Sequence, residues 1–279
     1  MNLNDAQLSE LESFHNWLTE ACSKGAVPVV TGKNGDMDTI GSAVALSAVH
    51  SNMMACGLHL GRTAKRMVES LQAPFRKLSE HQTVWPQSIG GIIVVDAAAA
   101  GQVGIDLPPN VPVCILDHHS TCDWNLNEGD LLLQWDVRAT TQIVDSYLNA
   151  YSPLSRSLVV RKMLLAGLLT DTGRFRHADR GAFQTAVDVL TGDDLDYASF
   201  VEFVESETTT PSERGSLLRG LGRATSLESG SWNIVHTHSG TLEGRLAGLL
   251  IGTGAEIALV SRFRDGQTRL TARASRQTT

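Results

Sequence analysis

Residues 111–117 read VPVCILD and residues 91–96 read GIIVVD, two short apolar runs rich in β-branched side chains. Each run ends in an aspartate, Asp117 in the first and Asp96 in the second. Runs this apolar are typical of strands covered on both faces, as in a parallel sheet with helices on either side. These two stretches therefore predict two strands of a buried sheet.

The preceding part of the chain continues the same alternation. Residues 26–31, AVPVVT, form another buried-strand run, and residues 57–60 predict a brief second strand. Segments at helical spacing precede and separate these runs, at the N-terminus and at residues 41–52 and 65–78. Alternating strands and helices predict a doubly wound, mostly parallel α/β domain.

The C-terminal part predicts a second, smaller α/β domain. Its strands are expected at residues 232–235, 256–263 and 268–273, with a turn at Asp265-Gly266, and its helix at residues 243–251. Helices near residues 180–190 and 211–225 are expected to connect the domains, the second starting at Pro211. The predicted boundaries are 1–192 for the first domain, 193–226 for a helical linker and 227–279 for the second domain.

Composition limits the classes of function. The 279 residues are 42% hydrophobic and 19% charged, as in an ordinary globular protein. No run reaches the roughly 18 apolar residues of a membrane span, and the N-terminus lacks the pattern of a secretory leader, so we expect a cytoplasmic protein. The four cysteines form no CxxC pair, which disfavours a zinc knuckle or a disulfide framework. A net charge of −7 argues against binding to duplex DNA.

Ionisable residues follow four of the apolar runs. In open α/β sheets, ligands bind beyond the carboxyl ends of the strands, so we expect these side chains to share one crevice. The candidate residues, in chain order, are Asp36 and Asp38, Asp96, the triplet Asp117, His118 and His119, and Asp171.

Several carboxylates in one crevice repel one another unless a cation neutralises them. Carboxylate and imidazole ligands without thiolate suit manganese or magnesium better than a cysteine-rich zinc site. Two such ions about 3.5–4 Å apart generate hydroxide and stabilise an in-line displacement at phosphorus.

Each motif taken alone has a simpler explanation. The Asp36-Met37-Asp38 segment is compatible with a turn or a helix cap, and Asp96, which precedes four alanines, with the cap of a following helix. Adjacent histidines such as His118 and His119 are more often structural than catalytic. The recurrence of such residues after four apolar elements favours a common site.

The four motifs, taken in order, resemble those of the DHH phosphoesterases. They are KNGDMDTIGS (33–42), VVD (94–96), DHH (117–119) and LTDTGRF (169–175). The last is most similar to the branch with nanoRNA and pAp hydrolases and some cyclic-dinucleotide phosphodiesterases. The resemblance implies a manganese-dependent phosphohydrolase with a DHH domain, a linker helix and a smaller substrate-binding (DHHA1-like) domain.

The resemblance also implies a role for each residue of the motifs. Asp38, Asp96, His118 and Asp171 would hold one metal, and Asp36 and Asp96 the other. His119 would polarise the substrate phosphate or protonate the leaving oxygen, and Asp117 would orient a histidine. Two manganese ions are expected, with magnesium as the alternative.

Substrate contacts are expected from three further residues. Arg273 and Arg276 lie where the family places an arginine that contacts phosphate or base, and a guanidinium suits a phosphate fork. An exposed edge strand that carries arginines is the alternative. Thr140 is expected to open a helix whose N-terminus receives phosphate, although capping would explain a threonine there equally well.

The chain departs from the family pattern at two places. Gly32 stands where many members have a histidine that ligates the first metal. That metal is then expected to bind weakly, to be completed by water or another side chain, or to be absent. The final residues, RASRQTT (273–279), lack the glycine-rich GGGH-like stretch of the small domain. The chain is then either a fragment or a member of a subgroup with a shortened second domain.

The sequence thus predicts hydrolysis of a short oligonucleotide, pAp or a cyclic dinucleotide by metal-activated water. A hydrolase of pyrophosphate or polyphosphate is the enzymatic alternative, and a nucleotide-binding module without turnover is the non-enzymatic one. The sequence leaves a homodimer open.

Overall fold

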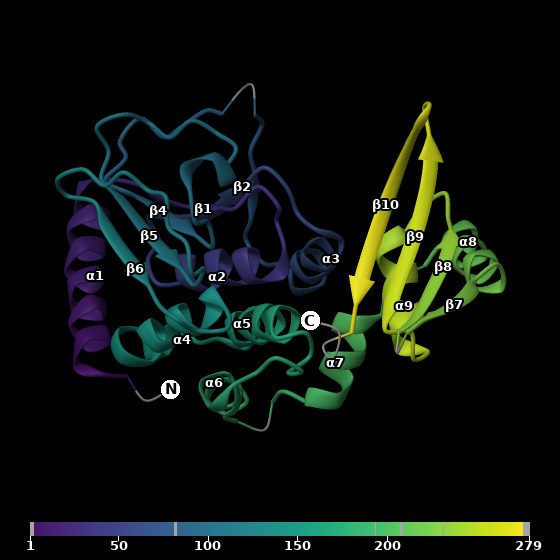
Figure 1. Ribbon diagram of the computed structural model, residues 1–279. Coiled ribbons are helices and arrows are strands. Elements are labelled where there is room, and N and C mark those ends of the chain that lie inside the picture. The colour runs from purple at the N-terminus through teal and green to yellow at the C-terminus, as the bar shows by residue number, and fades with distance from the viewer. Residues whose placement is uncertain (1–2, 81–82, 193, 207–208, 231, 276–279) are drawn as a thin grey trace. The chain divides into compact units, whose positions relative to one another are not determined.

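The chain divides into two compact units, residues 1–206 and residues 207–279, in a computed structural model (Figure 1). The structure describes all residues except 1–2, 81–82, 193, 207–208, 231 and 276–279. The predicted linker, 193–226, is divided between the units. Helix α7 (Tyr197–Glu205) belongs to the first unit, whereas α8 (Pro211–Gly222) belongs to the second.

A six-stranded sheet forms the centre of the first unit, with the order β3-β2-β1-β4-β5-β6. Every neighbouring pair is parallel, so the predicted α/β class with a parallel sheet is confirmed. The strands are β1 (Val27–Thr31), β2 (Met53–Gly57), β3 (Arg76–Lys77), β4 (Ile92–Val95), β5 (Val113–Asp117) and β6 (Leu131–Gln134).

The helices of the first unit contribute to one hydrophobic core on one face of this sheet. Helix α2 packs against α5 and α4 as well as the strands, and all three lie on the same side of the sheet in Figure 1. The helices are α1 (Asp5–Lys24), α2 (Met37–Ser47), α3 (Arg62–Leu71), α4 (Thr140–Tyr151), α5 (Leu158–Asp171), α6 (Arg180–Val189) and α7, with short 3₁₀ turns η1 (Ala100–Gln102) and η2 (Pro153–Ser155).

Loops cover the opposite face, where the sequence predicted helices. Partly buried side chains such as Trp85, Leu107 and Trp124 pack there against Val94 and Ile115. The segments that cross this face contain Pro-Pro and several glycines, which prevent a long helix. After Asp96 only the turn η1 forms, with Ala99 before it and no side-chain cap, so the alternative explanation of Asp96 as a helix cap does not hold.

Three element boundaries also differ from the prediction. The strand expected at 57–60 lies earlier, at β2, because pairing of Val27 with Met53 sets its register against β1. Helix α2 begins at Met37 rather than residue 41, since Asp36 caps it. Helix α3 ends at Leu71 rather than residue 78, because Gln72 takes a left-handed conformation and Pro74 follows.

The strand order reverses between β1 and β4. Chain connections run outward from β1 through β2 to β3, and outward from β4 through β5 to β6. Ligands of doubly wound sheets bind beyond the carboxyl ends of the strands at such a reversal. The residues that follow β1 and β4 therefore border the expected binding crevice.

The second unit is a four-stranded sheet of order β10-β9-β8-β7 with helices on one face. Its central pair, β8 and β9, is parallel, and both outer pairs are antiparallel. The smaller α/β domain and the turn at Asp265-Gly266 are thereby confirmed. The elements are α8, β7 (Thr225–Ser229), β8 (Trp232–His238), α9 (Glu243–Gly252), β9 (Ile257–Arg264) and β10 (Gln267–Ala274).

No helix in the described part of the chain is both long enough and apolar enough to cross a bilayer.

Candidate metal centre

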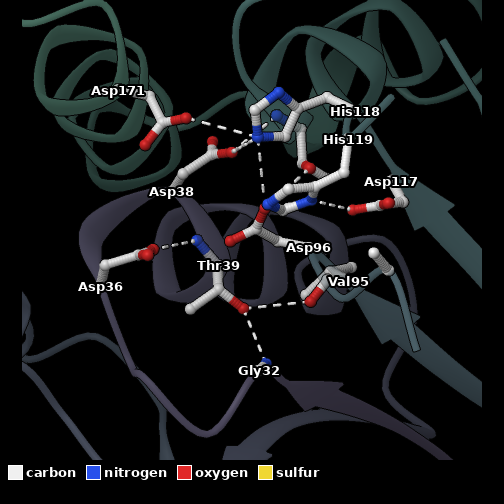
Figure 2. A network of polar contacts seen from close by, with 12 residues as sticks. Gly32, Asp36, Asp38, Thr39, Val95, Asp96, Asp117, His118, His119 and Asp171 are labelled. Carbon is white, nitrogen blue, oxygen red and sulfur yellow. Dashed lines mark hydrogen bonds and ion pairs between the residues drawn. The ribbon is translucent and has the colours of Figure 1, made fainter. Parts of the chain in front are cut away.

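The predicted acids and histidines meet at the carboxyl end of the parallel sheet (Figure 2). Asp36 and Asp38 begin α2, directly after the loop that follows β1, and Asp96 follows β4. Asp117 ends β5 and is followed by the two histidines. Asp171 comes from a different kind of element, because it is the last residue of α5. The convergence expected from the sequence is thus present.

The Nε2 atom of His118 lies at the centre of three carboxylates. It is 3.3 Å from Oδ2 of Asp171, 3.4 Å from Oδ1 of Asp96 and 3.9 Å from Oδ2 of Asp38. The side chains of Asp38 and Asp96 are almost completely buried, whereas that of Asp171 is 29% exposed. Solvent therefore reaches this cluster from the side of Asp171.

His119 is held by Asp117. Its Nδ1 lies 2.7 Å from Oδ1 of Asp117, which is fully buried, and 3.8 Å from Oδ1 of Asp96. The side-chain amide of Gln134 donates a 2.6 Å hydrogen bond to the carbonyl of His119. The imidazole itself is 42% exposed, so a fixed ring borders the cluster and remains open to a ligand.

Helix α4 positions Asp38. The backbone amides of Thr140 and Thr141 donate to Oδ2 and Oδ1 of Asp38 at 2.6 and 2.9 Å. Phosphate was expected to bind these amides, but they donate to the Asp38 carboxylate instead. A negative charge is stabilised at a helix N-terminus. The hydroxyl of Thr140 donates to Asp96 at 3.4 Å, and Thr140 is fully buried. Thr140 therefore holds Asp38 through its backbone amide and Asp96 through its hydroxyl.

The backbone of Asp96 also departs from the ordinary strand conformation. Its φ of 58° is left-handed, a region that asparagine and aspartate enter more readily than other non-glycine residues. Such conformations are held in place by surrounding structure and cluster at functional sites. The turn after β4 thus directs the Asp96 side chain into the cluster (Figure 2).

Burial and repulsion between neighbouring carboxylates disfavour the ionised forms of Asp38 and Asp171. Burial raises the pKa of Asp38 well above its usual range, and the charges of Asp96 and Asp171 raise it further. Burial, followed by the charge of Asp96, raises the pKa of Asp171 to about 6. Burial lowers the pKa of His118, but the hydrogen bond to Asp96 and the charges of the nearby carboxylates outweigh it and raise the pKa to about 9. The centre thus favours a positive charge.

The donor set fits a divalent cation. Two groups of three residues, Asp96-His118-His119 and Asp38-His118-Asp171, each bring their ligand atoms within 4.8 Å of one another. All donors are carboxylate oxygens or imidazole nitrogens, which suit a hard or borderline ion. Asp36 belongs to neither group among the described residues; burial and then the charge of Asp96 raise its pKa.

The two C-terminal arginines lie in the second unit or outside the described residues. Arg273 is on β10, paired with Ala258 of β9, and an added Cβ at Gly248 of α9 would lie 3.7 Å from its Nη1. Arg273 therefore occupies the face of the sheet that bears α9. Arg276 lies outside the described residues.

Gly167 supports the site but was missed from the sequence, whereas Thr141 was expected there together with Thr140. An ideal Cβ on Gly167 of α5 would lie 2.6 Å from Cγ2 of Thr141 and 3.1 Å from Cα of Asp38. Only glycine allows α5 to approach Asp38 this closely. A glycine inside the apolar helix LLAGLL was the available signal, because such a glycine costs about 1 kcal/mol relative to alanine and often has a packing reason.

Comparisons with known proteins concern mainly the fold. No protein-family model matches the chain. The uncharacterized protein MJ0988 of Methanocaldococcus jannaschii is 24% identical over 266 residues, which cover 92% of this chain and 78% of that protein.

Three solved structures share the architecture. An exopolyphosphatase-related protein from Bacteroides fragilis has a TM-score of 0.74 and 13% identity, covering 96% of this chain and 84% of its own. A protein from Methanococcus jannaschii described as a candidate family II inorganic pyrophosphatase has a TM-score of 0.54 and 14% identity, covering 90% and 88%.

The third structure is described as a DHH domain. It is the DHH domain of a protein described as a member of a family of ribosomal proteins, with a TM-score of 0.50, 9% identity, and coverage of 98% of this chain and 79% of that one. The chain therefore has the DHH-domain fold that its four motifs predict.

Proposed function

We propose that the chain is a metal-dependent phosphohydrolase of the DHH type. The observation that carries the proposal is the convergence of Asp38, Asp96 and Asp171 on Nε2 of His118 at 3.3–3.9 Å, at the carboxyl end of the sheet. Carboxylates with raised pKa values around one imidazole make a site that a divalent cation stabilises. The fold of the solved DHH-domain structure supports the same assignment.

The residues that hold the cation are Asp38, Asp96, His118 and Asp171, with manganese as the first choice and magnesium as the second. When bound, the cation supplies an activated water and compensates the charge of a phosphate. The amides of Thr140 and Thr141 keep Asp38 in one orientation. A ligand held by such supporting hydrogen bonds loses little freedom when a metal binds.

His119 and Asp117 form the acid–base pair. The Nδ1–H of His119 donates to the buried Asp117, which fixes the tautomer and the orientation of the ring. The Nε2 atom is then the one that faces a substrate, since the ring is partly exposed. When Nε2 is protonated as well, His119 is an imidazolium that donates the Nε2 proton to the leaving oxygen and returns to the neutral Nδ1–H form; Asp117 acts only through the histidine.

The substrate class is a small phosphorylated compound. Short oligonucleotides, pAp and cyclic dinucleotides follow from the resemblance of TDTGRF, with Arg273 and Arg276 as phosphate contacts. Inorganic pyrophosphate or polyphosphate is the second candidate, favoured by the names of two structures with this fold. A nucleotide-binding module without turnover is the non-enzymatic alternative.

Turnover of a substrate panel with manganese tests the proposal. The panel is pApA, pAp, cyclic di-AMP and pyrophosphate, and the variants are His118→Ala and His50→Ala, a control at an exposed histidine outside the centre. We expect one class of substrate to be hydrolysed, the activity to disappear in H118A and to persist in H50A. Nucleotide binding without any product would refute the enzymatic proposal in favour of a nucleotide-binding module. Equal activity in both variants would refute the proposed metal centre.

A further inference from the structure

We propose that each chain binds a single divalent cation, and that Asp36 is not one of its ligands. The inference rests on the proposed function, in which the cluster around His118 binds metal. It differs from the two-ion arrangement that the family resemblance implies. The reason lies in this chain's own residues around the first motif, Gly32, Asn34, Asp36 and Thr39.

Both oxygens of Asp36 already accept hydrogen bonds. Oδ1 accepts from the backbone amide of Thr39 at 3.1 Å, which makes Asp36 the N-cap of α2. Oδ2 accepts from the side-chain amide of Asn34 at 2.6 Å. Figure 2 shows the Asp36 carboxylate directed at Thr39, whereas the carboxylates of Asp38 and Asp171 point toward His118. Hydrogen bonds alone do not exclude a ligand, because both oxygens of Asp38 accept them as well. Asp38 differs in that its Oδ2 lies 3.9 Å from Nε2 of His118, whereas Asp36 belongs to no group of possible ligands among the described residues.

The space beside Asp36 does not admit the ligand that the family places there. The amide of Gly32 donates to the hydroxyl of Thr39 at 2.9 Å, and this hydroxyl donates to the carbonyl of Val95 at 3.0 Å. These bonds hold the loop after β1 against the end of β4. An ideal Cβ on Gly32 would lie 2.9 Å from the carbonyl oxygen of Asp96 and 3.1 Å from Oδ1 of Asn34. A side chain at position 32 would therefore have to move the backbone that carries Asp96.

The remaining donors describe one centre. Both three-residue groups that could hold an ion contain His118, and within the described part of the chain no such group contains Asp36. One ring nitrogen has one lone pair and binds one ion. Asp38, Asp96 and Asp171 all approach the same Nε2 atom. The geometry thus suits one cation between these side chains, without a second position beside Asp36.

Metal counting with matched variants tests this inference. The demetallated protein is equilibrated with manganese, the bound metal is measured by elemental analysis, and the electron paramagnetic resonance spectrum distinguishes isolated ions from an interacting pair. The variants are Asp36→Asn and Asp171→Asn, the same chemical change at two half-buried or partly exposed acids. Asparagine is also a good N-cap, so Asp36→Asn keeps the start of α2; circular dichroism checks the fold of both variants.

The expected result is one manganese ion per chain with the spectrum of an isolated ion. Asp36→Asn should keep that stoichiometry and change the dissociation constant by less than about threefold, whereas Asp171→Asn should weaken binding by at least about tenfold. Two ions per chain, an interacting pair, or an equal loss in both variants would overturn the inference and leave metal-dependent hydrolysis standing. No bound manganese would overturn both.

Discussion

The pair Asp117–His119 is the most specific chemical feature at the scale of single residues. Asp117 ends a central strand with no solvent exposure, and its Oδ1 holds Nδ1 of His119 at 2.7 Å. His118 is the neighbour in sequence but faces three other carboxylates. The two adjacent histidines therefore have different partners, which is why we propose metal binding for His118 and proton transfer for His119.

Replacing Asp117 separates these two roles. We expect Asp117→Asn to leave manganese affinity within about threefold and to lower turnover by about 10²–10⁴-fold, the range typical of general acid–base catalysis, because the ring of His119 loses its fixed tautomer. The measurement is steady-state kinetics beside a metal titration. The double variant with His119→Ala should be no slower than His119→Ala alone. Additive losses would show that Asp117 acts independently of His119.

The close approach of α2, α4 and α5 determines the site at the scale of elements. Asp38 starts α2, the N-terminal amides of α4 hold its carboxylate, and Gly167 of α5 lies against its backbone. Helices α4 and α5, more than 100 residues later in the chain, thus both contact this residue of α2. A change in the packing of α5 against Asp38 is therefore expected to change the affinity for manganese.

Gly167→Ala tests this packing. The added methyl would lie 2.6 Å from Thr141 and 3.1 Å from Asp38, so we expect a loss of about 1–3 kcal/mol of stability and at least about tenfold weaker manganese binding. Gly244→Ala on α9 is the control, since nothing lies within 4 Å of its added Cβ. Urea unfolding and metal titration measure both effects. Unchanged metal affinity in G167A would remove α5 from the support of Asp38.

Asp145 on α4 gives the stability of the first unit a defined pH dependence. Its side chain is 1% exposed and lies 2.7 Å from Nη1 of Arg156. Burial raises its pKa from 3.8 to about 6, although the charge of Arg156 opposes the rise. The native state therefore binds this proton more tightly than the unfolded chain does. The resulting stabilisation is fully present below pH 3.8 and is lost as pH rises through about 6.

Asp145→Asn should remove this dependence. Between about pH 4 and about pH 7, the free energy of unfolding of the unmodified protein should fall relative to D145N by up to about 3 kcal/mol, which is the shift of roughly two units converted to energy. Urea unfolding at several pH values measures the difference. Curves that stay parallel for the two proteins would contradict the raised pKa.

Each unit has its own buried hydrophobic residues at the scale of the whole molecule. The first unit buries its sheet between helices and loops, whereas the second has a core of few buried side chains around Leu246 and Val260. A small core supports less stability, because less apolar surface is removed from water. The sheet of the second unit should accordingly open more readily than the central strands of the first.

Leu246→Ala tests whether the two cores are independent. Leu246 is fully buried, and a truncation of this kind costs about 2–5 kcal/mol. We expect faster amide hydrogen exchange in β8 and β9, with unchanged exchange in β4 and β5 and unchanged manganese affinity. Hydrogen exchange followed by mass spectrometry gives the readout. Acceleration in β4 and β5 as well would mean that the units unfold together.

The sequence alone was sufficient for the sheet and for most of the candidate site. Uninterrupted apolar runs such as Ile92–Val95 predict buried strands because a strand covered on both faces has no polar side. Acids directly after such runs lie at the carboxyl ends of the strands, which is why the meeting of Asp38, Asp96 and His118 could be expected. The earlier position of β2 was missed because its register depends on pairing with β1. The end of α3 was missed although Pro74 is a local signal for it.

Tertiary structure decided what the motifs could not. Loops rather than helices cover one face of the sheet, since segments rich in proline and glycine pack there through side chains such as Trp124. Asp36 and Asp38 belong to one three-residue motif, yet the first accepts a hydrogen bond from its own helix, and the second from the start of α4, 102 residues away. A pattern of residue types fixes which side chains are present at a strand end. Only long-range packing determines which backbone amide donates to each carboxylate. It thereby also determines which side of the carboxylate faces the proposed metal.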